Sequence, residues 1–185
     1  SGVNAIESIA KEVSDCLAKV SRDEVEHAVT LLDGATRVFV AGAGRSALGV
    51  RGFGMRLMHL GLTTYVVGET TTPGIGSGDV LVIGSGSGRT ASLLSSAKKA
   101  RALGASLLLV TIDPSSPIGQ LADFVIRVPA PSPKASGGGE SSSVQPMGSL
   151  FEQSLFILLD ALIVMLMEKR EINAADMFGR HANLE

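Results

Sequence analysis

The sequence predicts an α/β fold, a three-layer α-β-α sandwich in which a five-stranded parallel sheet is covered by helices on both faces. Short runs such as "RVFVAGAG" at 37–44 and "SLLLVTID" at 106–113 are almost continuously apolar, as in strands that are buried on both faces. Segments with apolar residues at helical spacing alternate with these runs. That alternation is typical of parallel strands joined by crossover helices.

Residues 1–34 are expected to form two helices before the first strand. Ser21 suits the N-cap of the second helix because its side chain can accept a backbone N–H, and Asp23 and Glu24 suit the positive first turn. That helix is expected to end near Gly34. In the first helix the apolar residues share one face: Ile6, Ile9, Val13, Leu17 and Val20.

The α/β core is predicted over residues 35–128. Gly61 and Gly104 are expected to end its long helices, at 45–61 and 89–105, because glycine readily adopts the left-handed conformation at a helix C-terminus. The strands are expected at 37–44, 63–69, 79–88, 106–113 and 123–128.

Residues 129–148, "PAPSPKASGGGESSSVQPMG", are predicted to form a loop because Pro, Gly and Ser dominate them. A loop of this length is often functional, so it either covers a site or is a passive connector, and its part at 134–143 is the candidate for closing over a ligand. Ser149 begins a long helix that reaches about Arg170, and a short helix completes the C-terminal part at 149–185. We expect a single domain over 1–185.

The composition limits the classes of function. The 185 residues carry a formal net charge of -2 without a basic cluster, which argues against a nucleic-acid partner. Cys16 is the lone cysteine, which suits a reducing cytoplasm. The longest apolar stretch, 155–167, is shorter than the ~20 residues of a membrane span, so no membrane contact is expected. A mean hydropathy of +0.33 indicates apolar subunit interfaces and therefore a homo-oligomer.

Two loops rich in small residues, in "VFVAGAGRSA" and "VLVIGSGSGRTA", follow predicted strands and precede helices. In a parallel sheet, ligands bind beyond the carboxyl ends of the strands, and a helix N-terminus there attracts phosphate. In the second loop, side-chain hydroxyls and the backbone amides of a glycine-rich turn can donate hydrogen bonds to a phosphate group. The first loop would face the same ligand. The residues concerned are Ser85, Ser87, Gly88 and Thr90 in the second loop and Gly44 and Ser46 in the first.

Three different roles suit these two loops less well. Gly and Ser can simply make tight turns, but the strand-to-helix context favours an anion site. The second loop lacks the Gly-Lys-Ser/Thr ending of a nucleotide P-loop, which argues against a triphosphate. Gly42, Gly44 and Ala47 could pass for a dinucleotide fingerprint, but no acidic residue ends the next strand about 20 residues later, and Glu69 comes too late.

The chain resembles the sugar isomerase domain family, whose hallmark is the Ser-x-Ser-Gly-x-Thr loop. The resemblance covers roughly 35–185 through "AGAGRSALGVRGFGMRLMHLG", "VIGSGSGRT", "QPMGSLFEQSLFILLDALI" and "HANLE" and is strongest to the hexulose-phosphate isomerases. It implies a flavodoxin-like fold and, without metal or organic cofactor, the interconversion of 3-hexulose 6-phosphate and fructose 6-phosphate through a cis-enediol, in ribulose monophosphate formaldehyde assimilation. The partner would thus be a phosphorylated ketohexose. Arg89, where relatives often carry Glu, could reinforce phosphate binding or face solvent, and a position in solvent is the expectation.

The resemblance also assigns acid–base roles. Glu152 matches the proposed enediol base, although the spacing from Ser149 also fits a capping box in which the carboxylate bonds the helix N-terminus. His181, in "RHANLE", matches a histidine that is thought to reach a neighbouring subunit's site and would carry protons to and from sugar hydroxyls. From its place near the chain end alone, a solvated side chain would be the simpler interpretation. The resemblance implies an oligomer, and a tetramer in particular.

Further polar residues lie near the predicted site. One of Arg45 and Arg51 is expected to meet substrate oxygens while the other pairs with an acid, and Glu69 could bind a sugar hydroxyl. His59 lies at a helix C-terminus, where it suits the helix dipole and is expected to be structural, with a place near the site as the alternative. Asp113, in "TIDPSSP", is expected to form a turn.

Two alternative functions stay open. The fold also serves in regulators that bind phosphosugars without catalysis, although these usually attach a basic DNA-binding domain and the residues before the first strand are not basic. An isomerase for another phosphosugar, a pentose or a heptose, is the other alternative, because sequence spacing does not measure the length of a pocket.

Overall fold

A five-stranded parallel sheet forms the centre of the fold in the computed structural model, which describes residues 4–132 and 143–185. The strand order is β2-β1-β3-β4-β5, so the chain reverses its direction of travel through the sheet between β1 and β3. This flavodoxin-like order confirms the predicted fold class and puts a ligand-binding crevice between those two strands. The strands are β1 (Val38–Gly42), β2 (Thr64–Val66), β3 (Val80–Gly84), β4 (Ser106–Thr111) and β5 (Phe124–Arg127).

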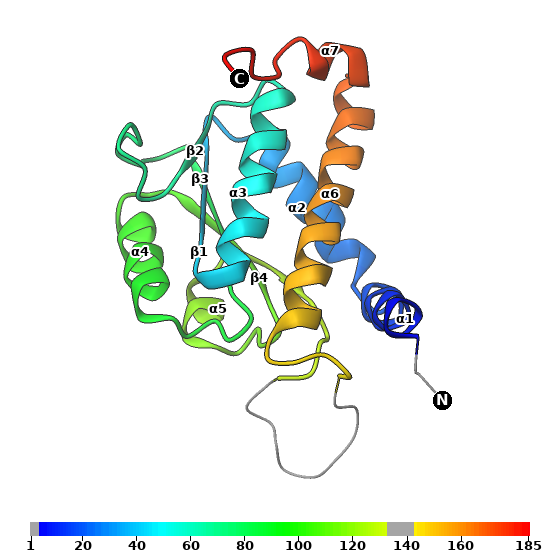
Figure 1. The fold of residues 1–185 in the computed structure, drawn as a ribbon. Coiled ribbons are helices and arrows are strands. Elements are labelled where there is room, and N and C mark those ends of the chain that lie inside the picture. Colours follow the sequence, from blue (N-terminus) through cyan, green and yellow to red (C-terminus); the bar gives the residue numbers. More distant parts are fainter. Residues whose placement is uncertain (1–3, 133–142) are drawn as a thin grey trace.

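Helices cover both faces of the sheet (Figure 1). Alternate strand residues point to opposite faces, so Val38 and Val40 enter one core while Phe39 and Ala41 enter the other. Four helices cover the first face: α1 (Ala5–Leu17), α2 (Arg22–Asp33), α3 (Gly44–His59) and α6 (Ser149–Arg170). On the second face lie α4 (Ala91–Ala102) and α5 (Pro117–Leu121). Beyond α6, α7 (Ala174–Phe178) precedes the C-terminus.

Helix ends follow the predicted chemistry. Ser21 caps α2 by accepting the Glu24 N–H at 3.3 Å. Gly61 and Gly104 have φ of +91° and +84°, the left-handed conformation expected after a helix. The short α5 was not predicted, although Ser116 as its N-cap and Pro117 in its first turn are typical of a helix start. Half of the predicted loop over 129–148, residues 133–142, lies outside the described residues, including 134–142 of the segment considered for closing over a ligand.

The expectation about membrane spans needs one correction. The apolar stretch at 155–167 is extended by helical residues on both sides, so α6 spans 22 residues and is long and apolar enough to cross a membrane. Half of its most apolar window is buried inside the protein, as in the core helix of a globular fold. Length and composition alone are therefore weak evidence for a span.

A buried ion pair joins the starts of β1 and β3. Asp79 is 1% exposed and accepts two hydrogen bonds from Arg37, from Nε at 2.9 Å and from Nη2 at 2.5 Å, and another from the Gly76 N–H at 2.8 Å. Burial alone would raise the pKa of Asp79, but the hydrogen bonds from Arg37 and Gly76 and the Arg37 charge lower it below its ordinary value. The carboxylate is therefore stabilised in the folded protein.

We expect Asp79→Asn to lower the free energy of unfolding by roughly 3 kcal/mol at pH 7, because it leaves Arg37 without its charged partner. Since the folded-state pKa is lowered, this contribution is present above the unfolded-state pKa of about 4 and is lost as the pH falls through the folded value. Urea unfolding of both proteins at pH 7 and at pH 3 checks this. A difference that stays the same at pH 3 would contradict the role of the charge.

Candidate active site

The loop at 85–90 is braced by its own serines. The Ser85 hydroxyl is buried and accepts the Gly88 N–H at 3.0 Å, and the Ser87 hydroxyl accepts the Arg89 N–H at 3.2 Å. Accepting leaves each O–H free to donate to a bound anion. Thr90 is the N-cap of α4 but makes no side-chain capping bond, so its hydroxyl also remains available.

Residues after β4 hold this loop in place. Gly88 has φ of +61°, and a Cβ there would lie 2.0 Å from the buried Ser116 hydroxyl oxygen. The Gly88 carbonyl accepts the Ile118 N–H at 3.1 Å, and the Gly86 carbonyl accepts the Ile112 N–H at 3.1 Å. The loop is thus fixed before any ligand arrives. Sequence reasoning did not identify Ser116 as its support.

The loop leads directly into the N-terminus of α4. The first amides of a helix have no intrahelical acceptor, and the helix dipole adds a partial positive charge there. Together with the hydroxyls of Ser87 and Thr90, this end of α4 has the donors that an anion such as a phosphate group requires.

Glu152 lies in the first turn of α6 and faces the same edge of the sheet. The N-cap of α6 is Gly148, with no side-chain capping bond, so the alternative of a capping box formed by Ser149 and Glu152 is wrong. The Glu152 side chain is 20% exposed, and its Oε1 lies 3.3 Å from Arg45 Nη1. That contact has ion-pair distance without hydrogen-bond alignment, so the buried Oε1 makes no hydrogen bond. It is free to accept a proton from a ligand.

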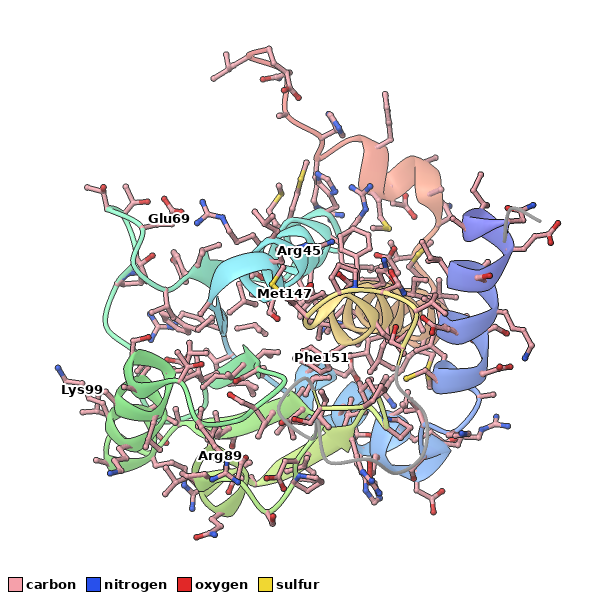
Figure 2. The ribbon with its side chains drawn as sticks, turned by 60° about the horizontal axis from the view of Figure 1, so that its bottom comes forward. Arg45, Glu69, Arg89, Lys99, Met147 and Phe151 are labelled. Atoms are coloured by element: carbon pink, nitrogen blue, oxygen red, sulfur yellow. The ribbon has the colours of Figure 1, made fainter. Side chains whose placement is uncertain are left out.

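Arg45 links the first turns of α3 and α6. Its Nη1 donates to the Ser149 hydroxyl at 3.0 Å while it faces Glu152. Figure 2 shows Arg45, Met147 and Phe151 at this edge of the sheet. A Cβ on Gly86 would lie 3.2 Å from the Phe151 ring, so the loop at 85–90 borders the first turn of α6. The first turn of α3, the first turn of α6 and the loop at 85–90 are therefore neighbours at this edge of the sheet.

The first loop contributes backbone and one hydroxyl. Gly44 is the first residue of α3 and has φ of +56°, with open space around its Cβ position. Ser46 follows Arg45 in the same turn and is half-buried. Both lie at the carboxyl end of β1, which pairs with β3 from Val38 opposite Val80 to Gly42 opposite Gly84. The two loops are therefore neighbours.

Arg51 and Glu69 form an ion pair on the β2 side of the site. Arg51 is therefore an arginine that pairs with an acid, as expected for one of the two, while Arg45 lies beside Glu152. A hollow of about 210 Å³ opens beside Arg51, between α3, α4 and the ends of β1 and β2. In Figure 2 Glu69 lies at the outer edge, away from Arg45.

Arg89 does not simply face solvent as expected. Its Nη2 lies 2.7 Å from Asp113 Oδ2, although its side chain is more than half exposed. Asp113 also accepts the Ser115 N–H at 3.0 Å and the Ser115 hydroxyl at 2.6 Å, which confirms its predicted turn role. The Ser115 hydroxyl, more than the Arg89 charge, lowers the pKa of Asp113. Arg89 thereby ties the loop at 85–90 to the segment after β4.

His59 and His181 lie at the C-terminal end of α3, opposite the end that carries Arg45. His59 is 3% exposed, and its ring stacks on His181 with centroids 5.5 Å apart. Burial first, and then the charges of Arg56 and His181, lower the pKa of His59. Burial thus opposes the charged form of the ring, although His59 lies in the last turn of α3, as expected from the sequence. From Arg45 to His59 α3 rises about 21 Å, so His181 does not meet Glu152 within this chain.

A carboxylate on α1 anchors the segment that leads into α6. Glu12 accepts the Val144 N–H at 2.7 Å, the Ser143 hydroxyl at 2.8 Å and the Gln145 side chain at 3.2 Å. Burial alone would raise the pKa of Glu12, but these hydrogen bonds lower it below its ordinary value. Glu12 sits among ordinary helical residues, so the sequence carries no signal for this role.

We expect Glu12→Ala to lower the free energy of unfolding by about 2 kcal/mol at neutral pH, because three donors lose a charged acceptor. Because the pKa of Glu12 is lowered in the folded protein, this contribution to stability is fully present at a pH above the unfolded-state pKa of about 4.3. It is lost as the pH falls through the folded-state pKa. Denaturant titration at pH 7 and at pH 3 checks both statements. Glu12→Gln, which keeps one carbonyl acceptor, is expected to lose less than Glu12→Ala; equal losses would argue against an anchor made of hydrogen bonds.

A metal site is not evident in the described ranges. Within residues 4–132 and 143–185, no group of three or more His, Cys, Asp or Glu side chains could hold a metal ion. Glu152 has a guanidinium as its neighbour and Asp113 has another. These two acids are thus paired with cations rather than gathered around a common point.

Comparison with known proteins relates this site to a family. The SIS domain family matches residues 31–157. A curated 3-hexulose-6-phosphate isomerase from Bacillus subtilis is 44% identical over 180 residues, covering 97% of this chain and 97% of that protein. A 3-hexulose-6-phosphate isomerase from Mycobacterium gastri is 43% identical over 182 residues and covers 98% of this chain and 90% of its own length.

Solved structures agree on the fold. The crystal structure of a hypothetical protein from Methanococcus jannaschii, which infers a molecular function of 3-hexulose-6-phosphate isomerase, has a TM-score of 0.84 and 29% identity, covering 99% of this chain and 100% of that one.

A regulator also matches in sequence. An HTH-type transcriptional regulator from Clostridium perfringens is 29% identical over 129 residues, but the match covers only 44% of its length.

Proposed function

The chain belongs to the SIS domain family, and we propose that it catalyses the interconversion of 3-hexulose 6-phosphate and fructose 6-phosphate. The relatives that carry this activity in their names match it over nearly their whole lengths. The observation that supports catalysis rather than binding alone is Glu152, whose buried carboxylate oxygen makes no hydrogen bond beside the loop at 85–90. A regulator that only binds a phosphosugar would need the loop for the phosphate group but no carboxylate to take up a proton.

The loop and α4 bind the phosphate group of the substrate. Backbone amides at the N-terminus of α4 and the hydroxyls of Ser85, Ser87 and Thr90 donate to its oxygens, in the way that helix N-termini hold anions generally. This contact fixes one end of the sugar. The carbonyl carbon and its neighbour are then held beside the first turns of α3 and α6, where Gly44, Arg45 and Ser46 lie opposite Glu152.

Glu152 moves the proton that the reaction requires. Its carboxylate removes the proton from carbon 2, the electrons form a cis-enediolate, and a proton returns to carbon 3 so that the carbonyl moves to carbon 2. Arg45, which neighbours Glu152, stabilises the negative charge that develops on the sugar oxygens. Neither step changes the number of electrons or consumes another reactant.

A second proton-transferring group must serve the hydroxyl oxygens, and His181 is the residue we assign to it. An imidazole can both donate and accept near neutral pH. Because His181 lies at the other end of α3 in its own chain, a neighbouring copy has to supply it, which makes the active protein a homo-oligomer. We propose a tetramer, acting in the cytoplasm, where the lone Cys16 would stay reduced.

The test is turnover of enzymatically generated 3-hexulose 6-phosphate, followed as fructose 6-phosphate, with and without EDTA. We expect turnover that survives EDTA, and much weaker turnover of a pentose phosphate at the same concentration. If a folded protein binds sugar phosphates but converts none, the regulatory alternative replaces the proposal. If it converts the pentose phosphate best, the isomerase class stands and the substrate is wrong.

A further inference from the structure

Ser149, the first residue of α6, shares a side of that helix with Glu152. The two residues are separated by one helical turn, so their side chains are neighbours. Ser149 is only 4% exposed, and its hydroxyl oxygen accepts a hydrogen bond from Arg45 Nη1 at 3.0 Å. The same nitrogen lies 3.3 Å from Glu152 Oε1. One guanidinium nitrogen thus lies between a buried hydroxyl and a carboxylate.

The carboxylate is the stronger acceptor of the two, yet the hydroxyl receives the hydrogen bond. A guanidinium and a carboxylate that can approach freely form charge-assisted hydrogen bonds of about 2.7–2.9 Å, often two in parallel. The contact between Arg45 and Glu152 is longer and not aligned, and Oε1 is buried without a hydrogen-bond partner among the described residues. A buried acceptor left unpaired is costly. A specific contact must therefore hold Arg45 in this orientation.

Ser149 supplies that contact. The N–H groups of a guanidinium are fixed in one plane, so directing one of them at Ser149 limits where the others can point. If Arg45 turned toward Glu152, the buried Ser149 oxygen would lose its donor, which opposes the movement. The hydroxyl therefore competes with Glu152 Oε1 for the guanidinium.

This competition matters for the chemistry of Glu152. A carboxylate oxygen that accepts an aligned N–H from a cation is a weaker base, because the hydrogen bond stabilises the charged form. With Arg45 directed at Ser149, Oε1 keeps its lone pairs for a substrate proton. The positive charge stays nearby, and the other N–H groups of Arg45 remain for the sugar oxygens.

From these contacts we propose that Ser149 is a positioning residue for catalysis, which holds the Arg45 guanidinium beside Glu152 but out of an aligned ion pair with it. This role differs from helix capping, since the N-cap of α6 is Gly148. The inference rests on the proposed function, in which Glu152 is the base. The orientation of Arg45, however, can be observed without turnover.

Ser149→Ala tests the role, because it removes the hydroxyl and lets Arg45 turn to Glu152. We expect kcat to fall about 30-fold and KM to change less than about twofold, since the loop at 85–90 is untouched. The acid side of the pH profile of kcat/KM is expected to move to lower pH by about one unit, because an aligned cation keeps the carboxylate charged. A fall in kcat with an unmoved pH profile would contradict the role, and so would an unchanged kcat.

Two further variants separate the hydroxyl from its surroundings. Ser149→Thr keeps the hydroxyl and is expected to keep most of the turnover and the wild-type pH profile. Ser154→Ala removes another buried hydroxyl from the same helix and is the matched control, with wild-type kcat expected. If Ser154→Ala lost as much turnover as Ser149→Ala, a loss of packing in α6 would explain both, and the proposal would fail.

A double-mutant cycle shows whether Ser149 acts through Arg45. In an Arg45→Gln background there is no cation to hold, so adding Ser149→Ala is expected to change kcat less than about twofold and to leave the pH profile in place. Losses that multiply in the double variant would mean that the two residues act independently.

The crystal structure of Ser149→Ala gives a readout that does not depend on activity. We expect it to show Arg45 and Glu152 joined by aligned hydrogen bonds of about 2.8 Å. An Arg45 side chain that stays in its wild-type orientation would overturn the proposal. If the wild type converts no hexulose phosphate, the proposed function fails, while this structure still decides whether Ser149 holds Arg45.

Discussion

Replacing Glu152 by Gln is expected to lower kcat about 10³- to 10⁴-fold, with little change in the affinity for sugar phosphate. The amide keeps the size of the side chain and its distance from Arg45, but it cannot take a proton from carbon 2. Binding is retained because the phosphate is held by the loop at 85–90 and the N-terminus of α4, on other elements of the fold. Steady-state kinetics and calorimetric binding of fructose 6-phosphate measure the two quantities separately.

Glu168→Gln is the matched control, since Glu168 lies on the same helix and is exposed. It is expected to have wild-type turnover. A second signature is exchange of the carbon 3 proton of fructose 6-phosphate with deuterium from D₂O, which Glu152→Gln should abolish together with turnover. Exchange that continues at the wild-type rate would identify another residue as the base.

The fold could be predicted because its signals are local. Apolar strands, Ser21 as a cap and Gly61 as a helix stop each depend on a few neighbouring residues, and all of them agree with the structure. The short α5 was missed because its helical pattern has no room to repeat, although Ser116 and Pro117 mark its start. The length of α6 as a possible span was underestimated because less apolar residues at both ends continue the helix.

The site could be predicted only where a motif carries it. The spacing of Ser85, Ser87 and Thr90 predicts an anion cradle, and the structure places these residues at the start of α4. Spacing could not show that Glu152 leaves the helix cap and faces Arg45 instead, because that depends on the packing of α3 against α6. For the same reason it could not reveal the anchor at Glu12, whose partners lie more than a hundred residues away.

Gly88→Ala is expected to damage both stability and substrate binding. Its φ of +61° costs an alanine about 1–2 kcal/mol, and the new methyl group would lie 2.0 Å from the Ser116 hydroxyl oxygen. Since Ser116 is buried and caps α5, it has no room to retreat. We expect the free energy of unfolding to fall by about 3–5 kcal/mol and the melting temperature by roughly 10 °C.

Gly68→Ala separates backbone strain from the steric clash. Gly68 has φ of +93° but nothing within 4 Å of its Cβ position, so that variant is expected to lose only the strain of about 1–2 kcal/mol and to keep its KM. In Gly88→Ala, by contrast, the displaced loop no longer aims the Ser85 and Ser87 hydroxyls at one phosphate, so KM is expected to rise at least tenfold. Equal effects of the two variants on KM would mean that the loop at 85–90 is not the phosphate site. Adding Ser116→Gly to Gly88→Ala removes the clashing hydroxyl, and recovery of KM in that double variant would locate the cause at this contact.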